Sequence, residues 1–253
     1  MKKRLSILML AARFTVYRVI LLLLGMSIVQ VGLFWLALGK EKKTGLDVLF
    51  RQSNNGWVVV IAFILLCVLL GKSVNGSGGA MNAYTIDRLS VSEIEFTGWF
   101  ALYNGLMFLV FWLWEALTVL SMCMIYMWQV PQEVAVGPQT IFLASYRVEY
   151  LHRLIPLADI SGWVRNGAFI VAMGICTAAN AYHERGGRRG VAIWFAAAIA
   201  LWGIWNVNDG NRTTWTDVML VAGSMLVAAI AVYTVISKER EIDKGGDRWV
   251  SGN

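Results

Sequence analysis

Charged residues and proline are both scarce in this chain. Only 15% of its 253 residues are Asp, Glu, Lys or Arg, whereas 58% are hydrophobic, and the mean hydropathy is +0.60. So few charges cannot cover a surface in contact with water, which excludes an ordinary soluble globular protein. The three prolines leave little to interrupt long helices. The lipid bilayer is therefore the expected solvent for most of the chain.

Residues that carry catalytic or metal chemistry are scarce as well, with two His and three Cys. Cys67, Cys123 and Cys176 lie in apolar runs and do not have the spacing of metal ligands. The sequence holds no HExxH pair and no Gly-x-Ser-x-Gly elbow, and its Gly-Ser-Gly-Gly stretch at residues 76–79 lacks the lysine of a nucleotide-binding loop. We therefore expect no enzyme activity, no metal and no cofactor in this chain.

Long apolar runs dominate what is present. A membrane-spanning helix needs roughly 20 mostly apolar residues, because the bilayer core offers no hydrogen bonds to the backbone. The runs are continuous rather than alternating, which favours helices. We predict an all-α polytopic membrane protein in which residues 1–253 form one transmembrane domain, with six spans at about residues 19–38, 57–71, 98–128, 167–182, 191–207 and 215–236.

The basic residues predict the orientation. Lys and Arg gather before residue 19, between residues 72 and 97, around 183–190 and after 237, although Lys40, Lys42 and Lys43 oppose this bias. The positive-inside rule then places both termini in the cytoplasm, with residues 237–253 as a cytoplasmic tail of a multi-pass cell-membrane protein. The net charge of +6 indicates contact with anionic membrane lipids rather than nucleic acid.

The first 18 residues are predicted to form a helix that lies along the inner leaflet. A cleaved signal peptide is the less favoured alternative. Both the polar region that ends at Arg18 and the apolar stretch that follows it are longer than signal peptides use.

A polar interruption separates the second and third spans at residues 72–97. Gly76, Gly78 and Gly79 form a flexible lead, and residues 81–89 are long enough for about two helical turns. Ser90 and Glu93 then have the spacing of a capping box that starts the next helix. A short helix between two joints suits a mechanical contact with a partner, and the alternative is a solvated loop.

Glu115 lies in the middle of the third span. An ionisable group at that depth is costly and is by default a functional candidate, either in a pathway or in a bond between helices. The alternative is a residue that serves packing alone.

Residues 141–157 carry charges and cannot easily cross lipid, so we predict a helix that lies on the outer leaflet. Read as one helix, the segment has an apolar face and a polar face. It is interpreted as an outer gate, with Glu149, His152 and Arg153 as the candidate gate residues, or as an ordinary interfacial linker. The apolar face holds Leu143, Tyr146, Tyr150, Leu151 and Leu154, and the polar face holds Ser145, Glu149, His152 and Arg153.

The short element from Tyr84 to Leu89 reads Tyr-Thr-Ile-Asp-Arg-Leu. Together with the N-terminal membrane helix and the six spans, this element resembles the permease subunits of ATP-binding-cassette (ABC) transporters of the type-2 exporter-like class. In that family a short cytoplasmic helix at this place docks into a groove on the ATPase subunit. One departure is the connection between the fifth and sixth spans, which is too short here for the re-entrant helices that such permeases often carry. The resemblance implies a role in ATPase coupling for Tyr84, Thr85, Asp87, Arg88, Leu89 and Glu93.

The resemblance further implies a permease of a bacterial inner membrane that forms an export pathway, driven by a separate ATPase subunit and paired with a second copy or a related permease. Small-residue faces at Gly174 with Ala178, or at Ser224 with Ala228, would allow close helix contacts in such a dimer. The alternatives are a membrane sensor or assembly factor that transports nothing and, less favoured, a membrane-embedded enzyme. A compact outer face suits a peptide, drug or lipid-like cargo equally well.

Overall fold

The computed structural model describes residues 2–40, 45–72, 92–129, 138–157, 159–185, 190–205 and 214–250. This part of the chain is helical without any strand, which confirms the predicted all-α fold. The helices are α1 (Lys2–Lys40), α2 (Leu46–Gln52), α3 (Asn55–Gly71), α5 (Glu93–Gln129), α6 (Pro138–Arg147), α7 (Glu149–Leu154), α8 (Ile160–Arg185), α9 (Ala192–Trp205) and α10 (Thr214–Val250).

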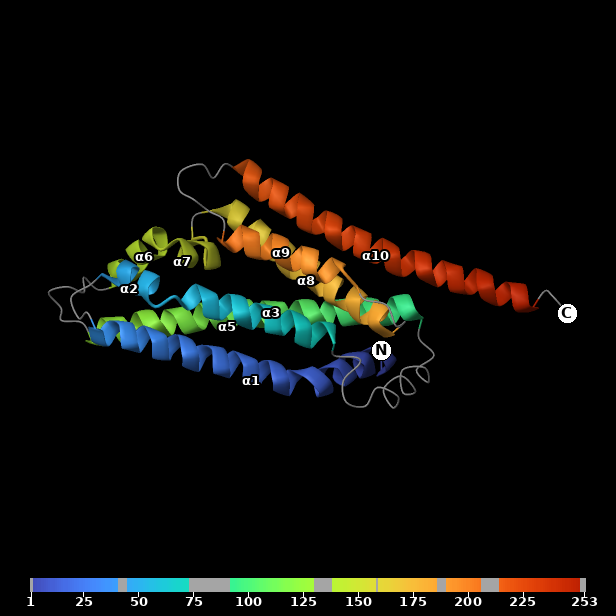
Figure 1. Ribbon diagram of the computed structural model, residues 1–253, viewed down its shortest axis with the longest axis horizontal. Coiled ribbons are helices and arrows are strands. Elements are labelled where there is room, and N and C mark those ends of the chain that lie inside the picture. Colours follow the sequence, from blue (N-terminus) through green and yellow to red (C-terminus); the bar gives the residue numbers. More distant parts are fainter. Residues whose placement is uncertain are drawn as a thin grey trace.

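The long helices form a bundle of two groups. Helix α1 packs against α3 and α5, and α8 packs against α5, α9 and α10. Figure 1 shows the short helices α2, α6 and α7 gathered at one end of the bundle, and the first turn of α5 near the opposite end. We call these the short-helix end and the α5-start end.

The outward surface of this bundle is apolar. Large side chains such as Ile28, Leu117 and Tyr233 are exposed, where a water-soluble bundle would place polar residues. Among the described residues three helical segments are long and apolar enough to cross a membrane, or four if the bent pair α2 and α3 counts as one span. These features fit a membrane protein. The three segments are Thr15–Gly39, Glu93–Gln129 and Trp215–Glu239.

The six predicted segments overlap α1, α3, α5, α8, α9 and α10, but those in α8 and α9 are not among the segments long and apolar enough to cross a membrane, so the count of six stays a prediction. The N-terminal prediction needs correction. Helix α1 runs without a break from Lys2 to Lys40, so no separate in-plane helix precedes the first predicted span. The physical reason is that residues 2–24 contain neither Gly nor Pro, so nothing in this stretch ends the helix.

The cap at the start of α5 lies two residues after the predicted capping box. Helix α5 begins at Glu93, and the backbone N–H of Glu95 donates a hydrogen bond to Ser92 Oγ at 3.2 Å. Ser92 and Glu95 thus hold the cap and N3 positions that the sequence assigned to Ser90 and Glu93. Ser90 itself lies outside the described residues.

Helices α5 and α8 approach each other very closely. A Cβ built on Gly174 of α8 would lie 2.8 Å from the carbonyl oxygen of Ala101 and from the Gly105 backbone of α5. One turn away, Asn104 Nδ2 donates a hydrogen bond to Thr177 Oγ1 at 3.0 Å. Small residues allow the two backbones to meet, and the buried amide holds them in register.

This contact corrects the predicted dimer faces. Gly174 and Ala178 are buried inside the chain, and so are Ser224 and Ala228. The small residues were correctly read as sites of close helix approach, but helices of the same chain occupy them. Neither pair is free to contact a second copy.

Candidate functional site

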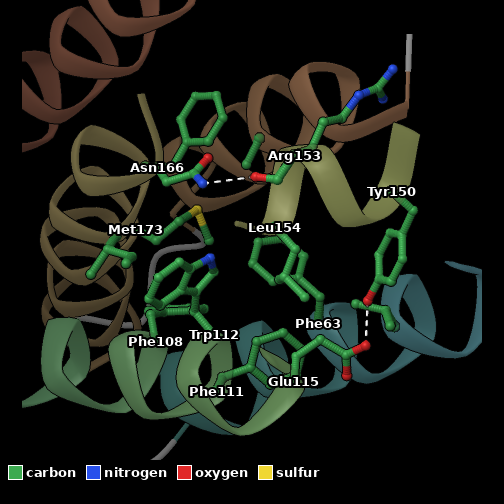
Figure 2. A pocket seen from close by; sticks show the side chains of 14 residues that line it. Phe63, Phe108, Phe111, Trp112, Glu115, Tyr150, Arg153, Leu154, Asn166 and Met173 are labelled. Carbon is green, nitrogen blue, oxygen red and sulfur yellow. Dashed lines mark hydrogen bonds between the residues drawn. The ribbon is translucent and has the colours of Figure 1, made fainter. Parts of the chain in front are cut away.

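An apolar cavity of about 100 Å³ lies beneath α7, between α3, α5, α8 and α9. Figure 2 shows its lining residues, with aromatic rings from α3 and α5 next to Leu154 of α7 and Met173 of α8. A wider pocket of about 360 Å³ adjoins it and shares Phe63, Phe111 and Tyr150 as lining residues. Six aromatic side chains line the smaller cavity: Phe63, Phe108, Phe111, Trp112, Tyr150 and Phe169.

Glu115 lies on the wall of this cavity and is only 1% exposed. Gln30 Nε2 of α1 donates a hydrogen bond to Glu115 Oε1 at 2.9 Å, and the Tyr150 hydroxyl of α7 donates to the same oxygen. Glu115 Oε2 and Gln30 Oε1 are both buried and have no partner among the described residues. The carboxyl group therefore joins three helices but is only partly satisfied.

Asn166 forms a second connection between α7 and the bundle. Its Nδ2 donates a hydrogen bond to the backbone oxygen of Arg153 at 2.9 Å. The Arg153 guanidinium points away from the aromatic rings of the cavity (Figure 2). The bonds at Tyr150 and at Arg153 together hold α7 as a cap over the cavity.

The predicted single outer helix is wrong, because the segment forms two helices. Val148 separates α6 from α7 in an extended conformation, with φ −92° and ψ 107°. This break rotates the second helix relative to the first, so the predicted faces do not hold. Ser145 and Arg153 are buried, whereas Leu143 and Tyr146 are exposed.

The three outer gate candidates accordingly have different surroundings. Arg153 is buried in the cap and lines both pockets. The His152 ring packs against the Tyr146 ring with centroids 5.5 Å apart. Glu149 begins α7, and its side chain lies outside the described part of the structure.

A buried ion pair connects α8 with α10. Arg165 Nη1 lies 2.8 Å from Asp217 Oδ1, and the two side chains are 2% and 7% exposed. Ser161 Oγ lies 2.7 Å from Asp217 Oδ2 and 2.8 Å from Asp159 Oδ1, so its single hydroxyl proton can be donated to either carboxylate. Burial acts to raise the pKa of Asp159, but the hydrogen bonds from Ser161 and Gly162 outweigh it and lower that pKa below its ordinary value. The α8 terminus is thus fixed by charge and by hydrogen bonds.

A second ion pair lies at the α5-start end. Arg185 Nη2 of α8 is 2.9 Å from Glu93 Oε2 of α5, and the guanidinium lies over the Phe96 ring at 4.7 Å from its centroid. Of the six predicted coupling residues, Glu93 alone lies in the described ranges. The other five, Tyr84, Thr85, Asp87, Arg88 and Leu89, lie outside the described residues.

Several residues of the site were not identified from sequence. Gln30 and Tyr150 are ordinary polar residues in apolar surroundings, and nothing in their spacing marks them as partners of Glu115. Arg165 and Asp217 carried a usable signal, because each is a charge at the edge of an apolar run. Within the described ranges no cluster of three His, Cys, Asp or Glu residues is arranged to hold a metal ion.

No protein-family model matches the chain, and no curated protein or solved structure is similar enough to indicate a relationship. The functional argument therefore rests on the geometry of the cavity, its cap and the two ion pairs.

Replacing Tyr150 by Phe is expected to loosen the α7 cap. The change removes a hydrogen-bond donor from a buried carboxyl group, which costs about 1–3 kcal/mol, so the backbone amides of α7 should exchange with deuterium faster. Tyr146→Phe is the matched control, because the Tyr146 side chain is exposed. Equal exchange rates in both variants and the wild type would show that the bond does not hold the cap.

Proposed function

We propose that this chain is the membrane-spanning permease subunit of an ABC transporter, with six spans that form an export pathway driven by a separate ATPase subunit. The observation that carries the proposal is the capped cavity inside a bundle of apolar helices. Bundle interiors are normally filled to close packing, whereas a partly open cavity beneath a short, separately tethered helix suits part of a pathway through the bundle.

The ion pair at the α5-start end supports the coupling part of the proposal. Residues 73–91, which carry the family-like motif, connect the end of α3 to the start of α5. Glu93 in the first turn of α5 is paired with Arg185 in the last turn of α8, and α8 lines the cavity. A force that an ATPase applied to residues 73–91 would reach α8 through this pair.

Replacing Tyr84 and Arg88 together by Ala tests the proposal. Aromatic and arginine anchors each contribute on the order of 2 kcal/mol at a protein interface, so the double variant should insert and fold normally but lose most of its bound ATPase. The measurement is co-purification of an ABC ATPase encoded beside this chain, together with ATP-driven export.

The matched control is the pair Tyr17→Ala and Arg18→Ala, because both residues are exposed on α1. This control should bind the ATPase like the wild type. If the Tyr84 and Arg88 double variant also binds the ATPase and exports at the wild-type rate, the permease proposal fails, and a sensor or assembly factor becomes the better interpretation.

The proposed orientation places both termini and residues 73–91 in the cytoplasm. Single cysteines introduced at Gly187 or Gly245 should therefore react with a membrane-impermeant thiol reagent only in inverted vesicles. The native Cys67, Cys123 and Cys176 are buried, so they contribute little background. Reaction in intact cells would overturn the orientation.

A further inference from the structure

Glu115 lacks a positively charged partner. Within the described ranges it makes no ion pair, and its two hydrogen-bond donors are the neutral groups of Gln30 and Tyr150. Burying a carboxylate without a counter-charge is energetically unfavourable. In addition, Glu115 Oε2 and Gln30 Oε1 are both acceptors without a donor. Glu115 lines the cavity, so a group there that brought a positive charge and an N–H donor would satisfy Glu115 Oε2.

The cavity beside Glu115 defines the shape of such a group. Its volume is about 100 Å³, less than the roughly 150 Å³ of an apolar cavity in another protein that accommodates benzene, so a ring-sized apolar body has to extend beyond it. Its walls include several aromatic faces, such as those of Phe63, Phe108 and Trp112 (Figure 2). The face of an aromatic ring attracts a cation, and the same ring offers an apolar contact surface. The adjoining pocket of about 360 Å³ leaves room for a larger substituent.

We propose that this cavity binds a small primary amine in its ammonium form, with a compact apolar body. The ammonium group donates a hydrogen bond to Glu115 Oε2 at the cavity wall, and the apolar body lies among the aromatic rings. That this amine is also the exported substrate rests on the proposed function. Binding itself needs only the residues described here.

The test is calorimetric titration of the purified full-length chain in lipid nanodiscs, without an ATPase. The probes are 2-phenylethylammonium and its neutral analogue 2-phenylethanol. The ammonium should bind more tightly than the alcohol, and Glu115→Gln should weaken ammonium binding by about tenfold or more while leaving the alcohol unchanged, because only the charge-assisted bond is lost.

A second pair of variants tests the site without altering Glu115. Ala200 of α9 lines the cavity, so Ala200→Leu should fill part of it and reduce the binding of both probes. Ala198 lies on the same helix but is exposed, and Ala198→Leu should bind both probes like the wild type. These variants decide the question even if Glu115→Gln fails to fold.

The absence of saturable ammonium binding would overturn the proposal, and so would equal affinity for the ammonium and the alcohol. Either result would show that Glu115 does not hold an ammonium ligand. The outcome is independent of the coupling experiment. Ammonium binding by a chain that co-purifies with no ABC ATPase would refute the transporter and keep the amine site, whereas ATPase-driven export without ammonium binding would do the reverse.

Discussion

Arg165→Leu is expected to destabilise the folded chain by about 3–5 kcal/mol, because it leaves a buried carboxylate without its cation. The Asp217 side chain is 7% exposed, and Arg165 is the cation at 2.8 Å. Ser161 would still donate to Asp217, but a neutral hydroxyl cannot replace a guanidinium. The measurement is the midpoint of thermal unfolding in detergent, followed by size-exclusion chromatography.

A double variant separates the cost of the orphaned charge from the loss of packing. Arg165→Leu combined with Asp217→Leu should recover most of the lost stability, since two apolar side chains in place of a buried ion pair are often close to neutral. Arg51→Leu is the control, because Arg51 is exposed. A single Arg165→Leu variant as stable as this control would show that the pair contributes nothing.

Gly174→Ala is expected to destabilise the chain by about 1–3 kcal/mol, although Ala is the better helix former. The new Cβ would lie 2.8 Å from backbone atoms of Ala101 and Gly105, and backbone atoms cannot rotate away as a side chain can. Helices α5 and α8 would have to separate, which would also stretch the bond between Asn104 and Thr177.

Gly32→Ala is the matched control, and its effect on the stability of the folded chain should have the opposite sign. Gly32 also lies inside a long helix, but a Cβ at that position meets nothing within 4 Å, so the variant should gain about 0.5–1 kcal/mol from helix propensity. The two glycine variants are compared by the same unfolding measurement. Equal stabilisation of both would show that the contact between α5 and α8 is looser than described.

The positions of the long helices followed from sequence because apolar runs of this length have few other solutions in lipid. The α7 cap could not be predicted from the sequence. A helical wheel over residues 141–157 assumes one unbroken helix, and the extended Val148 invalidates the wheel without leaving a proline or glycine to mark the break. The capping box at α5 was misplaced for a related reason, since Ser90 and Ser92 offer the same spacing and only tertiary structure selects one.

The candidate site was predictable only where a residue stood out from its own neighbours. Glu115 did so, as a single charge within an apolar run. Its partner Gln30 is 85 residues away, and Asp217 lies 52 residues from Arg165. Pairings over such separations depend on how the helices are arranged, which composition and periodicity do not encode.

The contacts between α5 and α8 imply where this molecule can move. The pair is joined along its length by Glu93 with Arg185, Asn104 with Thr177, Gly105 against Gly174 and Trp112 against Trp163. Two helices joined at these points are expected to move as one body, so an opening of the cavity is expected to come from α3, α7 or α9. Helix α3 could pivot where it meets α2, because the two helices are bent by 52° relative to each other. Asn54 lies at this bend and has a φ of 50°.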